Sequence, residues 1–249
     1  MKTKIYCIGD SHVSVFLGRD SLAQIYPIRN KSLFSKFEVI RIGPITAFNI
    51  GKVNSSTQAK VKIDILIKNE IPENSVFIFS AGEIDIRVHL LKQAKLKNKS
   101  ILEISSEIIE NYIKFLRKYA VEGNKIVVLS PPPASYLLDD DPEYPKNGTE
   151  QERNIATKIF CVQLKFQTQK NGFGFIDIFS NYIDINNNTK RQFLWDGVHP
   201  SSFVIKDIIR QLNKILSEKL TIPLSWIVRE VFSKFKNITF SNDLFKRYR

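Results

Sequence analysis

A repeated alternation of short apolar runs with longer segments of helical spacing most constrains the fold of this chain. The apolar runs, which predict strands, lie at residues 5–8, 37–42, 75–80, 125–130 and 174–179. The segments with helical spacing that follow them lie at 13–25, 55–69, 101–121, 150–170 and 201–220. Five strand–helix units in succession predict an α/β fold, a parallel sheet with helices on both faces. In such sheets ligands bind at the carboxyl ends of the strands.

The last part of the chain breaks this pattern. Residues 221–249 begin near Pro223 and interleave aromatic with basic side chains, namely Trp226, Phe232, Phe235 and Phe240 with Arg229, Lys234, Lys236, Lys246 and Arg247. We therefore predict an α/β domain at 1–220 and a basic, aromatic C-terminal extension at 221–249. The aromatic residues favour packing against a core or an interface, with a membrane surface as the alternative.

The net charge of +12 raises the question of a nucleic-acid partner. The lysines are spread along the whole chain, and no zinc-finger, RRM or KH pattern accompanies them. The charge is better explained as a long-range attraction for anions, such as acidic polysaccharide or an anionic membrane surface near the extension. We expect no specific nucleic-acid partner.

Cysteine content and hydropathy limit the remaining classes. Cys7 and Cys161 are too few for a disulfide framework or a metal site, so both are expected to be small buried residues, and no metal or organic cofactor is implied. No apolar run approaches the roughly 18 residues of a membrane span, and the N-terminus lacks a secretory signal pattern. These features together favour a cytoplasmic location.

Two short polar motifs stand at opposite ends of the predicted α/β pattern. The run 9–12, Gly-Asp-Ser-His, follows the first strand, and the run 196–200, Asp-Gly-Val-His-Pro, follows the fifth. A serine becomes nucleophilic when a histidine takes its proton, and a carboxylate holds that histidine in one tautomer. Ser11, His199 and Asp196 are therefore candidates for nucleophile, base and orienting carboxylate. Taken singly, Ser11 could equally cap a helix and His199 could be structural.

The two motifs together resemble the SGNH, or GDSL-like, hydrolases and esterases, whose first block is Gly-Asp-Ser and whose last is Asp-x-x-His-Pro. The glycine of their second block matches Gly43. The resemblance implies a flavodoxin-like three-layer α/β/α sandwich with a five-stranded parallel sheet of order 2-1-3-4-5. It also implies Ser11 as nucleophile, His199 as base, Asp196 as orienting group, and an oxyanion hole made by the backbone N–H groups of Ser11 and Gly43.

The third block of the family departs from its pattern here. The family has Gly-x-Asn-Asp, whose asparagine side chain donates to the oxyanion, but residues 82–85 are Gly-Glu-Ile-Asp. Ile84 cannot donate a hydrogen bond, so two backbone donors must suffice or another group, such as Arg87 or His89, must take over. We assign substrate binding to Glu83, Asp85, Arg87 and His89. A buried ion-pair cluster that braces the third strand is the alternative.

The Gly-Glu-Ile-Asp run with its following arginine and histidine resembles a subset of SGNH-like proteins associated with bacterial surface polysaccharides. We therefore predict a serine esterase that acts on O-acetyl or related esters of a carbohydrate or acylated small molecule through an acyl-Ser11 intermediate. One alternative is an O-acyltransferase in surface-polysaccharide biosynthesis. Another is a catalytically weak binding module, which Ile84 motivates.

Overall fold

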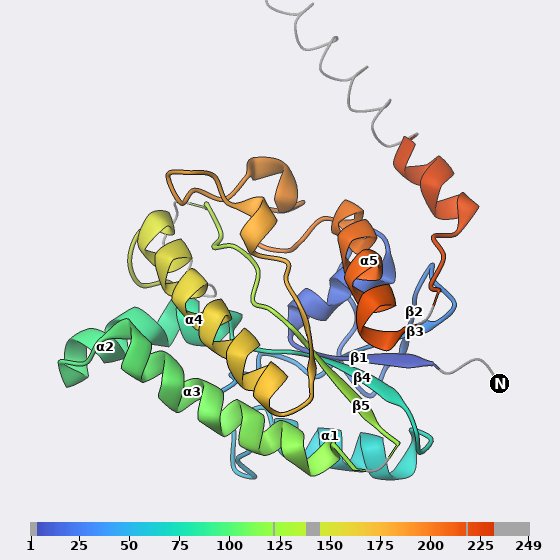
Figure 1. The fold of residues 1–249 in the computed structure, drawn as a ribbon, viewed down its shortest axis with the longest axis horizontal. Coiled ribbons are helices and arrows are strands. Elements are labelled where there is room, and N and C mark those ends of the chain that lie inside the picture. The colour runs from blue at the N-terminus through green and yellow to red at the C-terminus, as the bar shows by residue number, and fades with distance from the viewer. Residues whose placement is uncertain (1–3, 122, 138–144, 218, 232–249) are drawn as a thin grey trace, which may run out of the picture.

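A six-stranded sheet forms the centre of the computed structural model, which describes residues 4–121, 123–137, 145–217 and 219–231 (Figure 1). The strand order is β2-β3-β1-β4-β5-β6. The strands are β1 (Ile5–Gly9), β2 (Asn30–Lys31), β3 (Phe37–Arg41), β4 (Val76–Ser80), β5 (Lys125–Leu129) and β6 (Gly174–Ile176). All neighbours pair in parallel except β2 and β3, which are antiparallel.

The predicted α/β fold and strand order are confirmed, with one strand added. The parallel strands β3-β1-β4-β5-β6, numbered among themselves in chain order, have the predicted order 2-1-3-4-5. The prediction of five strands missed β2, which has only two residues and is half-buried or exposed. The side chain of Asn30 holds this short strand by donating to the carbonyl of Val39 at 3.2 Å. A segment of two residues carries no hydropathy pattern that could have predicted it.

Among the described residues between 59 and 216, five α-helices cover the two faces of the sheet. They are α1 (Ala59–Asn69), α2 (Leu91–Lys97), α3 (Ile101–Leu116), α4 (Glu150–Lys170) and α5 (Ile205–Leu216). Residues of α1, α3 and α4 share one buried cluster, whereas those of α5 share the other with the 3-10 helix Ser11–Leu17. Figure 1 shows α5 above the sheet and α1 and α3 below it. Both faces are therefore covered, which explains why the strands are continuously apolar.

Sequence-encoded caps fix the starts of two of these helices. Ser100 and Glu103 form a capping box at α3, and Thr149 and Glu152 form one at α4. The helix predicted at 13–25 is wrong in length, because only Ser11–Leu17 is helical and it is a 3-10 helix. Its residues from His12 to Leu17 are all buried. The helix is therefore covered on every side, whereas a surface helix would bury only one apolar face.

The described part of the C-terminal extension packs on the α/β domain. Trp226 is 1% exposed, its indole N–H donates to the carbonyl of Gly18 at 2.8 Å, and its ring lies 5.8 Å from that of Phe34. The aromatic and basic residues predicted to continue the extension from Phe232 onward lie outside the described residues. No helix among the described residues is long and apolar enough to cross a membrane.

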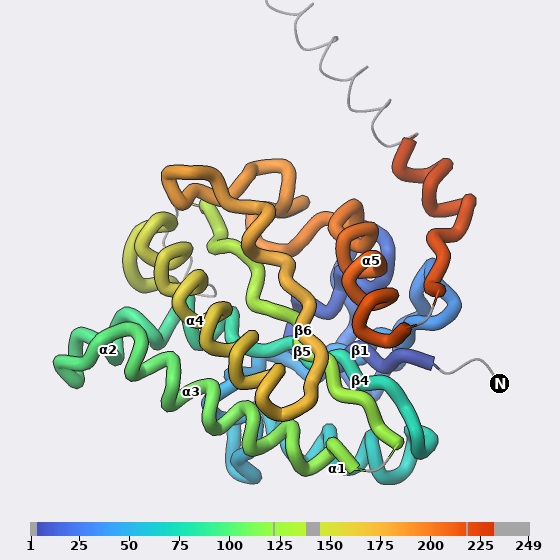
Figure 2. The backbone as a smooth tube through the Cα atoms, viewed as in Figure 1, coloured from blue at the N-terminus to red at the C-terminus, as the bar shows by residue number. Residues whose placement is uncertain are grey.

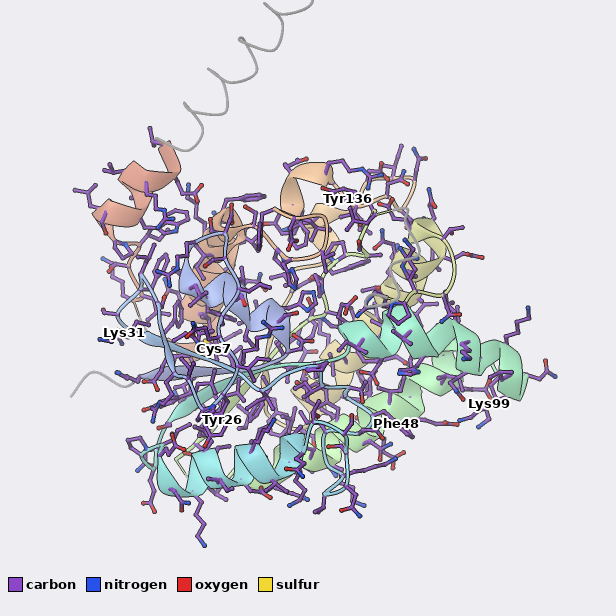
Figure 3. All side chains as sticks on the ribbon, turned by 180° about the vertical axis from the view of Figure 1, so that it is seen from behind. Cys7, Tyr26, Lys31, Phe48, Lys99 and Tyr136 are labelled. Carbon is purple, nitrogen blue, oxygen red and sulfur yellow. The ribbon has the colours of Figure 1, made fainter. Side chains whose placement is uncertain are left out.

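Both cysteines are free thiols in the interior, as predicted. Cys7 lies within β1, in the middle of the sheet (Figure 3), and Cys161 lies on α4. Burial raises the pKa of each thiol well above its usual value, which disfavours the reactive thiolate.

Candidate active site

Loops after several different strands meet at the carboxyl edge of the sheet. Ser11 lies two residues after β1, Gly43 lies two residues after β3, and the segment that contains Ile84 follows β4. The N–H of Ile42 donates to the carbonyl of Gly9 at 2.8 Å, which ties the turn after β3 to the turn after β1. The segment between β6 and α5, orange in Figure 2, contains His199, whose ring contacts Ser11 at the same edge.

A continuous chain of hydrogen bonds joins Ser11, His199 and Asp196. The Nε2 atom of His199 lies 2.9 Å from the Ser11 hydroxyl, and its Nδ1 atom lies 2.7 Å from Oδ2 of Asp196. Because an ionised carboxylate only accepts, Nδ1 carries the proton and Nε2 is left as the acceptor for the serine O–H. This is the arrangement in which a histidine can act as general base toward a serine.

Asp196 and His199 can form a hydrogen bond across so short a spacing because the Asp196 carboxylate also holds the turn between them. Its Oδ1 atom accepts the backbone N–H groups of Val198 at 2.9 Å and His199 at 2.7 Å. Gly197 takes a φ of 85°, a conformation that side chains disfavour, so the turn closes within three residues. Partial burial raises the pKa of Asp196, but the hydrogen bonds from His199 and Val198 outweigh it and hold the pKa below its usual value. Asp196 is therefore a charged partner for the histidine at neutral pH.

Asp10 and His12 order the loop around Ser11. One oxygen of the buried Asp10 carboxylate accepts from the His12 N–H at 3.0 Å and the Ser80 hydroxyl at 3.2 Å, and lies 3.2 Å from Nδ1 of His12. The His12 ring centroid lies 5.2 Å from that of His199. Burial lowers the pKa of His12, yet the charge and hydrogen bond of Asp10 raise it more, so the net shift is upward. Asp10 and His12 therefore hold the loop that carries Ser11.

The two predicted oxyanion donors occupy suitable backbone positions. Ser11 begins a 3-10 helix, and N–H groups in the first turn of a helix have no partner within it. Gly43 has a φ of 128°, which a residue with a side chain would rarely adopt. Ile84 is half-buried and lines a hollow together with Pro44 and Ile45. Where the family has an asparagine, this chain therefore places the apolar side chain of Ile84 beside the hollow.

Glu83 and Arg87 form a buried ion pair beneath the site. Nε of Arg87 donates to Oε1 of Glu83 at 2.7 Å, and its Nη1 atom donates to the carbonyl of Pro145 at 2.8 Å. Both residues are less than 10% exposed and lie one helical turn apart. The pair has the geometry of the bracing cluster that the sequence left open as an alternative to substrate contact.

Asp85 holds the loop that follows Gly43. Its carboxylate accepts the backbone N–H groups of Ala47 at 2.6 Å and Phe48 at 3.1 Å, and the residue is 1% exposed. Burial raises the pKa of Asp85 from 3.8 to about 7, although the backbone N–H groups act in the opposite direction. Asp85 therefore positions backbone at the site while its own oxygen atoms are already engaged.

Replacing Asp85 with asparagine is expected to flatten the pH dependence of the free energy of unfolding. The folded protein binds the Asp85 proton more tightly than the unfolded chain does, since its pKa of about 7 exceeds the usual 3.8. This contribution to stability is complete below about pH 4, falls as the pH rises, and is lost above about pH 7. Across that window wild type should lose roughly 3–5 kcal/mol that the D85N variant does not lose. Urea unfolding between pH 4.5 and 8 measures the difference. The E110Q variant at an exposed position of α3 is the control, and a pH-independent difference for D85N would contradict the assignment.

His89 is exposed and lines a polar hollow of about 500 Å³ between the loop after β3 and Ile84. The sequence prediction missed the rest of the lining, which comes from residues 44–59: Thr46, Asn49, Lys52, Asn54, Ser55, Ser56 and Thr57. The signal was the run of small and polar residues directly after the second predicted strand, in a position where α/β enzymes bind ligands.

The described residues contain no group of three or more histidine, cysteine, aspartate or glutamate side chains that could hold a metal ion. The acidic run 139–141 of the sequence lies outside these residues.

Comparison with known proteins agrees with this geometry. A family model described as GDSL-like lipase/acylhydrolase matches residues 5–203. Among solved structures, a catalytic mutant of an acetylxylan esterase from Geobacillus stearothermophilus is similar with a TM-score of 0.50 and 13% identity, covering 89% of this chain and 97% of that one. The aryl esterase of M. smegmatis is similar with a TM-score of 0.50 and 17% identity, covering 86% and 98%. At these identities the similarity concerns the fold. No curated protein matches the chain significantly.

Proposed function

From the premise that this chain belongs to the GDSL-like lipase/acylhydrolase family of enzymes that act on ester bonds, we propose that it is a serine esterase with an acyl-Ser11 intermediate. The observation that carries the proposal is the hydrogen-bonded chain from Ser11 through His199 to Asp196, with distances of 2.9 and 2.7 Å. Each group has the partner that its role requires.

The reaction begins with the ester carbonyl against the Ser11 hydroxyl. His199 takes the hydroxyl proton on Nε2 as the oxygen attacks, and Asp196 stabilises the imidazolium that forms. The oxyanion accepts from the backbone N–H groups of Ser11 and Gly43, and a donor of this kind is worth about 10²- to 10³-fold in rate. His199 then gives its proton to the departing alcohol oxygen. In the second half, water attacks the acyl carbonyl carbon and loses a proton to Nε2. The bond between that carbon and the Ser11 oxygen then breaks, Nε2 returns the proton to the Ser11 oxygen, and the carboxylic acid leaves.

We propose an O-acetylated or similarly acylated carbohydrate as the substrate. The hollow beside Gly43 is lined by hydroxyl and amide side chains rather than by a long apolar surface, which suits a polar ligand better than a fatty acyl chain. The acetylxylan esterase with a similar fold acts on a substrate of this class. An O-acyltransferase would use the same acyl-enzyme with a sugar hydroxyl in place of water.

A catalytically weak binding module remains the second candidate, because Ile84 stands where the family has an oxyanion donor. The same cleft would then bind an acylated saccharide without efficient turnover. The two candidates differ in the reactivity of Ser11 rather than in its position.

Covalent labelling with a fluorophosphonate tests the proposal directly. Mass spectrometry of the full chain is expected to find the label on Ser11, accompanied by hydrolysis of 4-nitrophenyl acetate, because an activated serine attacks phosphorus as it attacks an ester carbonyl. The H199A variant, which lacks the base, should label far more slowly. Absence of both labelling and hydrolysis in the wild type would favour the binding module. Product analysis with an added sugar acceptor separates the esterase from the transferase.

A further inference from the structure

The hollow of about 500 Å³ beside the active site has a size that suits a single small ligand. It begins at Pro44, directly after the proposed oxyanion residue Gly43, and Ile84 closes part of it. The methyl carbon of Thr57, another lining residue, lies 4.0 Å from the place where a Cβ on Gly43 would stand. A group bound here would therefore lie next to the scissile ester.

Polar side chains give this hollow several unused hydrogen-bonding groups. The hydroxyl and amide side chains that line it are those of Thr46, Asn49, Asn54, Ser55, Ser56 and Thr57. The Ser55 hydroxyl oxygen is shielded from solvent, and no partner for it is present among the described residues. Because a buried polar group without a partner is costly, rotation of the Ser55 side chain toward a ligand group in the hollow would be favoured.

Among the described residues that line the hollow, the charged side chain is a cation. None of the described residues that line the hollow is an aspartate or glutamate, whereas Lys52 contributes a cation. The Lys52 ammonium group lies 4.6 Å from the ring centroid of Phe48, a residue labelled in Figure 3. A cation–π contact of this kind favours this position of the exposed ammonium group.

His89 adds a neutral hydrogen-bonding group at the opposite side of the lining. Burial lowers its pKa, and the positive charges of Lys92 and Arg87 lower it further. Carboxylates lie close by in an adjoining hollow of about 240 Å³, which shares Thr46, Asn49 and His89. Asp85 there is engaged with backbone N–H groups, and Glu107 pairs with Lys97 and Lys99. Lys52 thus provides the unmatched charge of the larger hollow.

We propose that this hollow binds a carboxylate-bearing sugar, so that the ester substrate is an acylated acidic saccharide and Lys52 determines its selectivity. The inference rests on the proposed esterase function and names its substrate class. One lysine matches the single negative charge of a sugar carboxylate, and the surrounding hydroxyl and amide groups match the sugar hydroxyls. A dianionic phosphate would leave one charge without a partner.

Steady-state kinetics with two matched esters tests the selectivity. O-acetylated methyl glucuronoside and O-acetylated methyl glucoside differ only in the carboxylate, and we expect wild type to favour the first about tenfold in kcat/KM, the effect of one well-placed charge contact. The K52A variant should bring the ratio close to one by raising KM for the glucuronoside, with little change for the glucoside. The K158A variant on α4, which removes the same charge at an exposed distant position, should keep the preference. Equal rates in wild type, or equal losses on both esters in K52A, would overturn the proposal.

Direct binding separates this proposal from the proposed function. Isothermal titration of the S11A variant with methyl glucuronoside and methyl glucoside needs no chemistry, and we expect only the former to bind, more weakly at high salt because Lys52 is exposed. Loss of that binding in S11A/K52A would support the site even if no ester were hydrolysed. Ester hydrolysis without any preference for the glucuronoside in either assay would overturn the site and leave the esterase assignment in place.

Discussion

The S11A variant is expected to lose ester hydrolysis by roughly 10⁴- to 10⁶-fold in kcat, the range seen when a serine nucleophile is removed. In the proposed mechanism the hydroxyl oxygen of Ser11 forms the covalent bond to the acyl group. This oxygen lies 2.9 Å from Nε2 of His199, and no neighbouring oxygen in the hydrogen-bonded chain replaces it. Initial rates with 4-nitrophenyl acetate measure the loss.

A matched variant separates loss of chemistry from loss of structure. Ser14 lies on the same 3-10 helix, is buried, and accepts from the Ala23 N–H at 2.9 Å. The S14A variant therefore tests burial and a hydrogen bond on this helix without touching the nucleophile, and it should retain most activity. Substantial activity in folded S11A protein would refute the assignment of Ser11 as nucleophile.

The I84N variant is expected to raise kcat for ester hydrolysis by roughly 10- to 100-fold. Ile84 occupies the position at which the family places an oxyanion-donating asparagine, and it lines the hollow that starts beside Gly43. A donor aimed at the developing oxyanion is worth about 10²- to 10³-fold in other serine hydrolases. The expected gain is smaller, because the new side chain enters a site that is not packed for it. The measurement is kcat with 4-nitrophenyl acetate for purified variant and wild type.

The I84L variant provides the control for this gain. Leucine has a similar volume to isoleucine and no donor, so it should leave kcat within a few-fold of wild type. An equal rise in I84L and I84N would assign the effect to shape rather than to hydrogen bonding. No rise in I84N would mean that the backbone N–H groups of Ser11 and Gly43 already complete the oxyanion hole.

The proposed catalytic residues were predictable because they belong to short motifs with a physical reason for their spacing. Asp196 and His199 need only three residues of chain to meet, and Ser11 follows the first buried strand. The parallel order of the strands then requires their carboxyl ends to share one edge. For these residues, the sequence pattern and the strand topology together leave few possible positions in the fold.

The surroundings of Ser11 were less predictable because they depend on packing between segments far apart in the chain. The β2 strand has only two residues. The 3-10 helix that begins at Ser11 stands where the sequence predicted a longer helix, and its residues from His12 to Leu17 are buried on every side. Glu83 and Arg87 had two interpretations in the sequence, and only their 2.7 Å contact and their burial distinguish a bracing pair.

The residue pattern by itself therefore determined the fold class and the candidates for nucleophile, base and carboxylate, because hydropathy period and motif spacing are local properties of the chain. The strand order was implied by the resemblance to the SGNH hydrolases. Only the tertiary structure decided that Asp85 engages the backbone after Gly43 and that Lys52, Ser55 and Ile84 line one hollow. Those contacts join residues from the loop after β3 to residues after β4, and no local pattern specifies how two such loops pack together. We propose that the substrate is recognised at this junction.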